Sequence, residues 1–257
     1  MLTFMEWLGC RIALLLEEMG KVIIFFSKCI TWLCRPPFKF FNMLKQMEVI
    51  GVNSVIVVIL TGFFTGAVFS LQTYRGFHQF SAEYLVGYVV ALAISRELGP
   101  VLTGLMVTGR AGSLIAAEIG TMKVTEQVDA MEVMGVNPFQ YLIVPRIIAG
   151  IIVLPLLTII ADFIGIIGGF MITVKFLGQS SVVYWAGIRD NLEFSDLMQG
   201  LYKAMFFGMI LTVVGCYKGY YTAGGAEGVG KATTSAVVVA SVLILISDYI
   251  LTTLFFS

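Results

Sequence analysis

Residues 95–146 decide how the chain is organised, and they read SRELGPVLTGLMVTGRAGSLIAAEIGTMKVTEQVDAMEVMGVNPFQYLIVPR. An apolar segment that contains Arg96 and Glu97 leads into a short polar stretch at 121–135, and Pro138 precedes the next apolar segment. A charged pair at membrane depth is costly and points to a function by default. A charged helix between two membrane spans is a natural point of contact for a soluble partner.

The composition is that of an integral membrane protein. Of the 257 residues, 58% are hydrophobic and 12% are charged, whereas soluble domains carry about 25% charged residues. The mean hydropathy is +0.94, and the apolar residues form runs of about 20 or more, the length that a helix needs to cross a bilayer. The formal net charge is zero, so the chain lacks the basic footprint of a nucleic-acid-binding protein. We therefore predict an all-α integral membrane protein.

Apolar stretches predict five transmembrane helices with short connections. They cover residues 49–72, 84–117, 141–174, 197–217 and 232–256. The chain then divides into an N-terminal amphipathic interfacial segment at 1–47 and a five-helix membrane domain at 48–257. In the first of these, Glu17, Lys21 and Lys28 fall on nearly one helical face, which favours a helix lying in the membrane interface. A sixth span over residues 12–34 is the alternative.

Lysine and arginine residues set the expected orientation of the spans. Eleven of them fall in the N-terminal segment and in the 110–146 and 218–231 connections, whereas the opposite loops hold three. Because cytoplasmic loops are the basic ones, we predict a cytoplasmic N-terminus and a cytoplasmic helix at 118–140. Five spans then place the C-terminus on the outer side.

We predict that five charged residues lie at membrane depth, namely Arg96, Glu97, Asp162, Lys203 and Asp248. Neighbours on an α-helix point about 100° apart, so Arg96 and Glu97 need not pair with each other. One interpretation is a polar cavity that contacts a substrate. The other is a set of interhelical salt bridges, for example between Arg96 and Asp248 or between Glu97 and Lys203. Both can hold, because a substrate site also needs internal counter-charges.

The 121–135 stretch predicts a short amphipathic helix with Val124, Val128 and Met131 on one face, and Gly135 can cap it. An isolated helix of this length is marginal in water. Either its own spans or a soluble partner must therefore hold it. We expect a partner to dock here, and a solvated connector is the alternative.

Residues 225–231 read GAEGVGK, which matches a phosphate-binding P-loop up to its lysine. The next residue is Ala232, where the magnesium-binding Ser or Thr belongs, and no buried strand precedes the stretch. We therefore predict a glycine-rich turn and no ATP site. His78 stands alone and the four cysteines lack metal-site spacing. We predict no catalytic residues, no metal and no cofactor.

Small residues recur four positions apart in three of the spans, which allows close helix packing. The spacing does not separate packing within one subunit from packing across a dimer seam. The pairs are Gly62/Gly66, Gly165/Gly169 and Gly215/Gly219.

Three stretches together resemble the MlaE/YrbE family. They are RELGPVLTGLMVTGRAGS at 96–113, AAEIGTMKVTEQVDAMEVMGVNP at 116–138 and GAEGVGKATTSAVV at 225–238. The similarity covers about residues 48–256, with no departure from the motifs. This family comprises the permease subunits of ABC-type phospholipid transporters that work with MCE proteins.

The resemblance implies a homodimeric permease in the bacterial inner membrane that moves glycerophospholipids between the inner and outer membranes and so maintains lipid asymmetry. A separate cytoplasmic ATPase would drive it, a periplasmic MCE-domain protein would sit above it, and a STAS-domain protein would bind the ATPase. The lipid would lie near Arg96, Glu97, Lys203 and Asp248. The 121–135 helix would couple to the ATPase through Lys123, Glu126, Gln127, Asp129, Met131, Glu132 and Met134.

Two rival functions are a proton-coupled secondary transporter and a structural membrane anchor of an assembly. A carrier would need no ATPase and would more often show inverted repeats, which the sequence does not display. An anchor would tolerate replacement of Arg96 and Glu97 by an apolar pair without loss of lipid movement.

Overall fold

The computed structural model describes residues 17, 20–33 and 40–256, and every regular element in these parts of the chain is a helix. Five helical stretches there are long and apolar enough to cross a membrane. They are Phe40–His78, Glu83–Val124, Phe139–Phe176, Phe194–Tyr220 and Gly225–Phe255. The prediction of an all-α membrane protein with five spans is confirmed.

Several helices make up each of the first three stretches. The first contains α2 (Phe40–Ile50), η1 (Val52–Ser54) and α3 (Val55–His78). The second contains η2 (Glu83–Leu85), α4 (Val86–Ala93), η3 (Ile94–Leu98), α5 (Gly99–Val107), η4 (Thr108–Gly112) and α6 (Ser113–Val124). The third contains η5 (Phe139–Ile143), α8 (Val144–Phe170) and η6 (Met171–Phe176). Here η1 and η2 are 3-10 turns, whereas η3 to η6 are π-helical turns.

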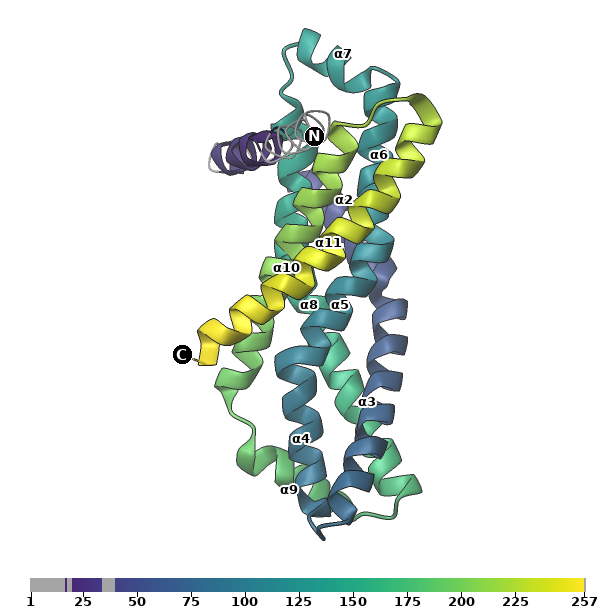
Figure 1. Ribbon diagram of the computed structural model, residues 1–257, viewed down its shortest axis with the longest axis vertical. Helices are drawn as coiled ribbons and strands as arrows, with labels where there is room; N and C mark the ends of the chain where they lie inside the picture. The colour runs from purple at the N-terminus through teal and green to yellow at the C-terminus, as the bar shows by residue number, and fades with distance from the viewer. Residues whose placement is uncertain (1–16, 18–19, 34–39, 257) are drawn as a thin grey trace, which may run out of the picture.

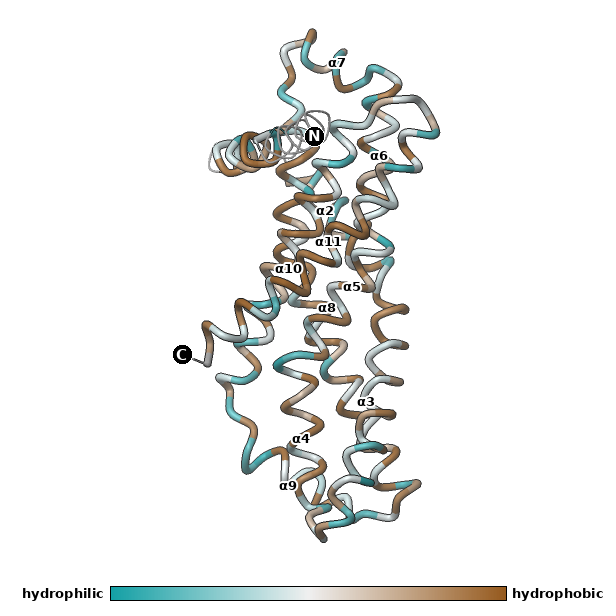
Figure 2. Tube along the Cα trace, viewed as in Figure 1, coloured by the Kyte–Doolittle hydropathy of each residue, from teal (hydrophilic) through white to brown (hydrophobic). Residues whose placement is uncertain are grey.

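The fourth and fifth stretches are the single helices α10 (Phe194–Tyr220) and α11 (Gly225–Phe256), and the short helices α7 (Gln127–Val133) and α9 (Ser181–Asn191) lie in connections. The bundle is elongated, with α7 at one end and α9 at the other (Figure 1). α11 crosses the bundle obliquely and ends part of the way along it (Figure 1). Hydrophobic residues run along the bundle, whereas hydrophilic ones gather at α7 and in the loop between α9 and α10 (Figure 2).

Glycine residues let α3 and α8 approach closely. A Cβ atom added at Gly66 would overlap the Gly165 carbonyl oxygen, and one added at Gly62 would lie 2.8 Å from the Ala161 carbonyl oxygen. Two of the small-residue pairs found in the sequence therefore pack against each other inside one subunit. The third pair, which begins at Gly215, packs against α6 in the same way.

Residues 20–33 are helical and lie across the long axis of the bundle, near the end that carries α7 (Figure 1). This helix packs on the bundle through Phe25 and Cys29, which are buried, and the Phe25 ring centroid lies 5.3 Å from that of Phe139. On its other side Ile23 is 65% exposed, as expected where an apolar face meets lipid. Of the predicted N-terminal segment, residues 1–16, 18–19 and 34–39 lie outside the described residues, and residues 40–47 belong to α2.

Two helix boundaries differ from those predicted. The first span begins at Phe40 rather than near residue 49, because α2 packs along α8 before the chain turns at η1. The polar 121–135 stretch is two pieces rather than one helix. α6 continues to Val124, and Glu126 then takes a φ of +60° immediately before α7. A residue in this left-handed conformation ends a helix, so the break falls inside the predicted element.

Candidate functional site

A π-helical turn, η3, carries Arg96 and Glu97 inside the second span. Pro100 follows shortly after, and proline has no amide hydrogen to give to the carbonyl one turn earlier. A helix whose hydrogen-bond ladder is interrupted in this way can take up an extra residue as a π turn, a feature that is frequent at functional sites. The two charged side chains therefore start where the helix departs from α geometry, and each reaches a different residue of α10.

Lys203 is the centre of a charge cluster that joins the second, fourth and fifth spans. Its ammonium group donates to Glu97 Oε2 at 2.5 Å and to the Thr252 hydroxyl at 2.6 Å, and it lies 3.0 Å from Asp248 Oδ1. The residue is 1% exposed. A lysine at this depth needs counter-charges, and Glu97 and Asp248 supply them. The salt bridge between Glu97 and Lys203 suggested by the sequence is thus present.

Arg96 pairs with Asp196 and not with Asp248, which corrects one of the pairings suggested by the sequence. Its Nε donates to Asp196 Oδ1 at 2.9 Å, and a terminal guanidinium nitrogen donates to the same oxygen. Asp196 is buried, and its other oxygen accepts the Glu193 amide at 3.1 Å in a capping box that starts α10. The sequence analysis missed Asp196 because it started the fourth span at 197. An acid three residues after Glu193, just before an apolar run, was the available signal.

The cluster binds the second span to α10 at two points. Asp196 and Lys203 are seven residues apart, so they lie on the same face of α10. Part of the charge cluster remains exposed, because the side chain of Glu97 is 37% exposed and that of Arg96 is 26% exposed. A carboxylate and a guanidinium are thus accessible at membrane depth on one face of a single subunit.

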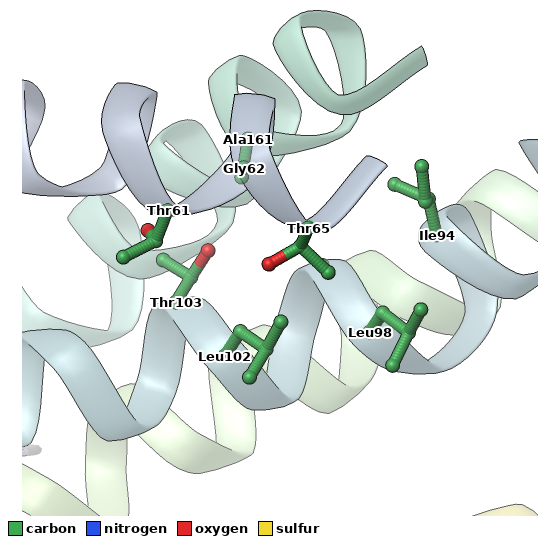
Figure 3. A pocket seen from close by; sticks show the side chains of 9 residues that line it. Thr61, Gly62, Thr65, Ile94, Leu98, Leu102, Thr103 and Ala161 are labelled. Atoms are coloured by element: carbon green, nitrogen blue, oxygen red, sulfur yellow. The ribbon is translucent and has the colours of Figure 1, made fainter. Parts of the chain in front are cut away.

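Asp162 stands apart from this cluster. It is 8% exposed, and its Oδ1 accepts no hydrogen bond from any residue that the structure describes. The carboxylate packs against Gly99, where an added Cβ would overlap it. Beside Gly99 lies a cavity of about 10 Å³, into which the hydroxyls of Thr65 and Thr103 are turned (Figure 3). Such a volume takes about one water molecule, so this cavity does not hold a lipid.

The expected coupling residues lie at the far end of the bundle, on and beside α7. Val128 is fully buried and Met131 packs against the core, so the protein's own spans hold α7 in place. Lys123 pairs with Asp129 at 2.5 Å. Val133, which the sequence analysis did not single out, is 89% exposed. The exposed members of the predicted set are Glu126, Gln127, Asp129, Glu132 and Met134.

Residues 225–231 form the first turns of α11. Lys231 pairs with Glu227 one turn earlier at 2.7 Å, and both side chains are exposed. In a P-loop, by contrast, a strand leads into a loop whose amides surround a phosphate. Here the stretch follows α10 after a short turn and is helical from Gly225 on, so it starts the fifth span as predicted but is not itself a glycine-rich turn.

Five membrane-crossing helices and a charge cluster between three of them define a multi-pass helical membrane protein. The model of the family Permease MlaE matches residues 43–254, and the chain belongs to this family of ABC transporter permeases. It is 49% identical over 256 residues to a probable ABC transporter permease protein of Rickettsia bellii, covering 100% of this chain and 99% of that protein.

Two more distant relatives are the intermembrane phospholipid transport system permease protein MlaE of Haemophilus influenzae and the chloroplastic protein TRIGALACTOSYLDIACYLGLYCEROL 1 of Arabidopsis thaliana. The first is 43% identical over 215 residues, covering 83% of this chain and 82% of that protein. The second is 41% identical over 215 residues, covering 84% of this chain and 61% of that protein. The resemblance inferred from the motifs is confirmed.

Proposed function

We propose that this permease moves glycerophospholipids between the inner and outer membranes, powered by a separate ATPase, and thereby maintains the lipid asymmetry of the outer membrane. The name of the Haemophilus relative supports phospholipid as the cargo. The observation that carries the proposal is the charge cluster, in which a fully buried Lys203 is neutralised by a partly exposed Glu97. Phospholipid headgroups combine phosphate with ammonium or hydroxyl groups, and a site of mixed sign can meet both.

The lipid headgroup lies, in this proposal, against Arg96, Glu97, Lys203 and Asp248 at the centre of a homodimer. A second copy is needed to enclose the headgroup, because the side chains of Glu97 and Arg96 stay 37% and 26% exposed in one subunit. α11 supports this arrangement, since Tyr249, next to Asp248, is 74% exposed. A copy facing α11 would enclose the open side of the cluster and leave room between the subunits for acyl chains.

The same proposal gives the protein an orientation in the inner membrane. The α7 end, with its excess of basic residues, is cytoplasmic, and the helix at 20–33 lies in the cytoplasmic interface. α7 then docks on the ATPase, which also binds the STAS-domain protein. The α9 end faces the periplasm and the MCE-domain protein, and the C-terminus emerges on that side.

Charge reversal on α7 tests the ATPase contact. The double variant Glu126→Lys/Asp129→Lys should lose co-purification of the ATPase while the permease still inserts and runs as folded protein. Glu227→Lys is the matched control, because its carboxylate is exposed at the same end of the bundle, on α11. Unchanged co-purification of the double variant would refute docking through α7.

The cargo is tested on the purified complex. Mass spectrometry of extracted lipid should detect glycerophospholipid in the wild type and much less in Glu97→Ala/Lys203→Ala, compared at equal protein amount. A complex that carries neither phospholipid nor an ATPase would overturn the proposal as a whole.

A further inference from the structure

A second polar cavity lies at the α7 end of the bundle, away from the charge cluster. It has a volume of about 240 Å³ and is bounded by α2, η5, α6 and α8. This is room for a headgroup-sized ligand rather than for one water molecule. Its polar lining consists of Asn42, Lys45, Gln46, Glu118, Tyr141 and Arg146.

Arg146 is the buried charged side chain that lines this cavity. The residue is 5% exposed, its guanidinium donates to the Leu142 carbonyl at 2.8 Å and to Glu118 Oε2 at 2.9 Å, and its Nε has no hydrogen-bond partner among the described residues. A buried charged donor without an acceptor is costly. Because Nε itself has almost no accessible surface, an anionic oxygen in the cavity would approach the guanidinium at its terminal nitrogens, and guanidinium groups match phosphate geometry well.

α2 supplies the rest of the recognition surface. Asn42, Lys45 and Gln46 are spaced so that they share one helical face, and all three line the cavity. Lys45 is exposed and forms no ion pair with any residue that the structure describes. With Glu118 already bonded to Arg146, the cavity keeps one uncompensated positive charge, from Lys45.

The position of the cavity indicates the source of the anion. α2 begins the first span, Tyr141 lies near the start of the third and Glu118 near the end of the second, so the cavity sits at one membrane boundary. Beside it on α2, Phe41 is 80% and Leu44 is 48% exposed, which offers an apolar surface to acyl chains. Basic pockets between spans at a cytoplasmic boundary suit anionic headgroups.

We propose that this cavity binds the phosphate of an anionic phospholipid from the cytoplasmic leaflet, as a site separate from the transport cluster. The leaflet assignment rests on the orientation given under the proposed function. The bound phosphate would connect Lys45 of α2 with Arg146 of α8. Because Arg146 also holds Glu118, the lipid would stabilise α6, the helix that leads to α7.

The test is lipid binding to the full-length permease in detergent, measured by native mass spectrometry during titration with phosphatidylglycerol or phosphatidylcholine. The wild type should bind phosphatidylglycerol more tightly than phosphatidylcholine. Lys45→Gln should weaken phosphatidylglycerol binding about fivefold, the effect of one lysine near an anionic membrane surface, and leave phosphatidylcholine binding unchanged. Lys231→Gln, at the same end but outside the cavity, is the control and should bind as the wild type does.

Inorganic phosphate alone separates the two sources of the anion. If phosphate raises the melting temperature of the wild type as much as phosphatidylglycerol does, the ligand is a free anion and the lipid site is refuted. Equal phosphatidylglycerol affinity for Lys45→Gln and the wild type would also overturn the proposal. Neither the co-purification of the ATPase nor the binding of lipid at the charge cluster depends on Lys45. If this second lipid site is refuted, the proposed function therefore still stands.

Discussion

Replacement of Lys203 by methionine is the most direct test of the charge cluster. Methionine keeps the length and much of the packing of the lysine stem but removes the ammonium group. Glu97 and Asp248 would then face each other with no cation between them, although they lie 2.5 Å and 3.0 Å from the lysine nitrogen in the native protein. The Thr252 hydroxyl would lose the same partner.

The expected loss in the free energy of unfolding follows from the burial of the ion pairs around Lys203. Removing one member of a buried ion pair costs about 3–5 kcal/mol. Glu97 keeps 37% of its side-chain surface open and can be solvated, so we expect the lower end, about 3 kcal/mol. One kcal/mol shifts the melting temperature of a chain of this size by about 2–4 °C, so Lys203→Met should lower it by about 6–12 °C.

Thermal unfolding of the purified permease in one detergent measures this shift. Lys231→Met is the matched control, because it breaks an exposed pair with Glu227 and should cost well under about 1 kcal/mol. Lys203→Met/Glu97→Gln/Asp248→Asn removes the stranded carboxylates as well and should recover most of the loss. If Lys203→Met melts no lower than the control, the cluster does not stabilise the bundle. If the triple variant melts as low as Lys203→Met, lost packing rather than unpaired charge is the cause.

Two further predictions concern packing. Gly66→Ala should destabilise the protein by about 1–3 kcal/mol, because its Cβ would overlap the Gly165 carbonyl and force α3 from α8; a melting temperature equal to that of the wild type would contradict this packing. Burial raises the pKa of the Cys29 thiol to about 12, so at pH 7.5 it stays protonated and should react with maleimide at least about 100 times more slowly than a cysteine introduced by Lys21→Cys on the polar, exposed side of the same helix. Mass spectrometry can follow the labelling of each cysteine. Equal labelling rates for the two cysteines would show that the helix at 20–33 does not pack on the bundle.

The membrane fold follows from the sequence because the bilayer leaves few choices. A span needs about 20 apolar residues with its backbone hydrogen bonds satisfied internally, so apolar run length predicts the number of spans. The packing partners of charged residues are not determined in this way. The pairing of Arg96 with Asp196 depends on how the second span lies against α10, which neither hydropathy nor helical periodicity contains. The π turn η3 likewise changes where two adjacent side chains point, and Pro100 was a sign of an interruption without specifying its form.

The predicted coupling helix shows the same limit at shorter range. Its apolar face was identified correctly, since Val128 and Met131 pack inward. The break at Glu126 was not, because a left-handed φ at a glutamate runs against its intrinsic preference. Tertiary contacts override that preference here, since α7 must turn across the end of the bundle to bury Val128.

These local breaks bear on how a force at α7 would reach the charge cluster. The push would not pass along one straight helix, because the second span contains a second π turn, η4, between the cluster and α6. The guanidinium of Arg110, in η4, donates to the Val49 carbonyl at 3.0 Å and to the Ser54 hydroxyl at 2.8 Å. This fixes the π turn to the junction of α2 and α3. Helices bend at π turns rather than within regular α segments, so under the proposed function a push on α7 would tilt α6 about η4. The cluster would then respond through the contacts of α6 with α10 and α11 more than through the axis of its own helix.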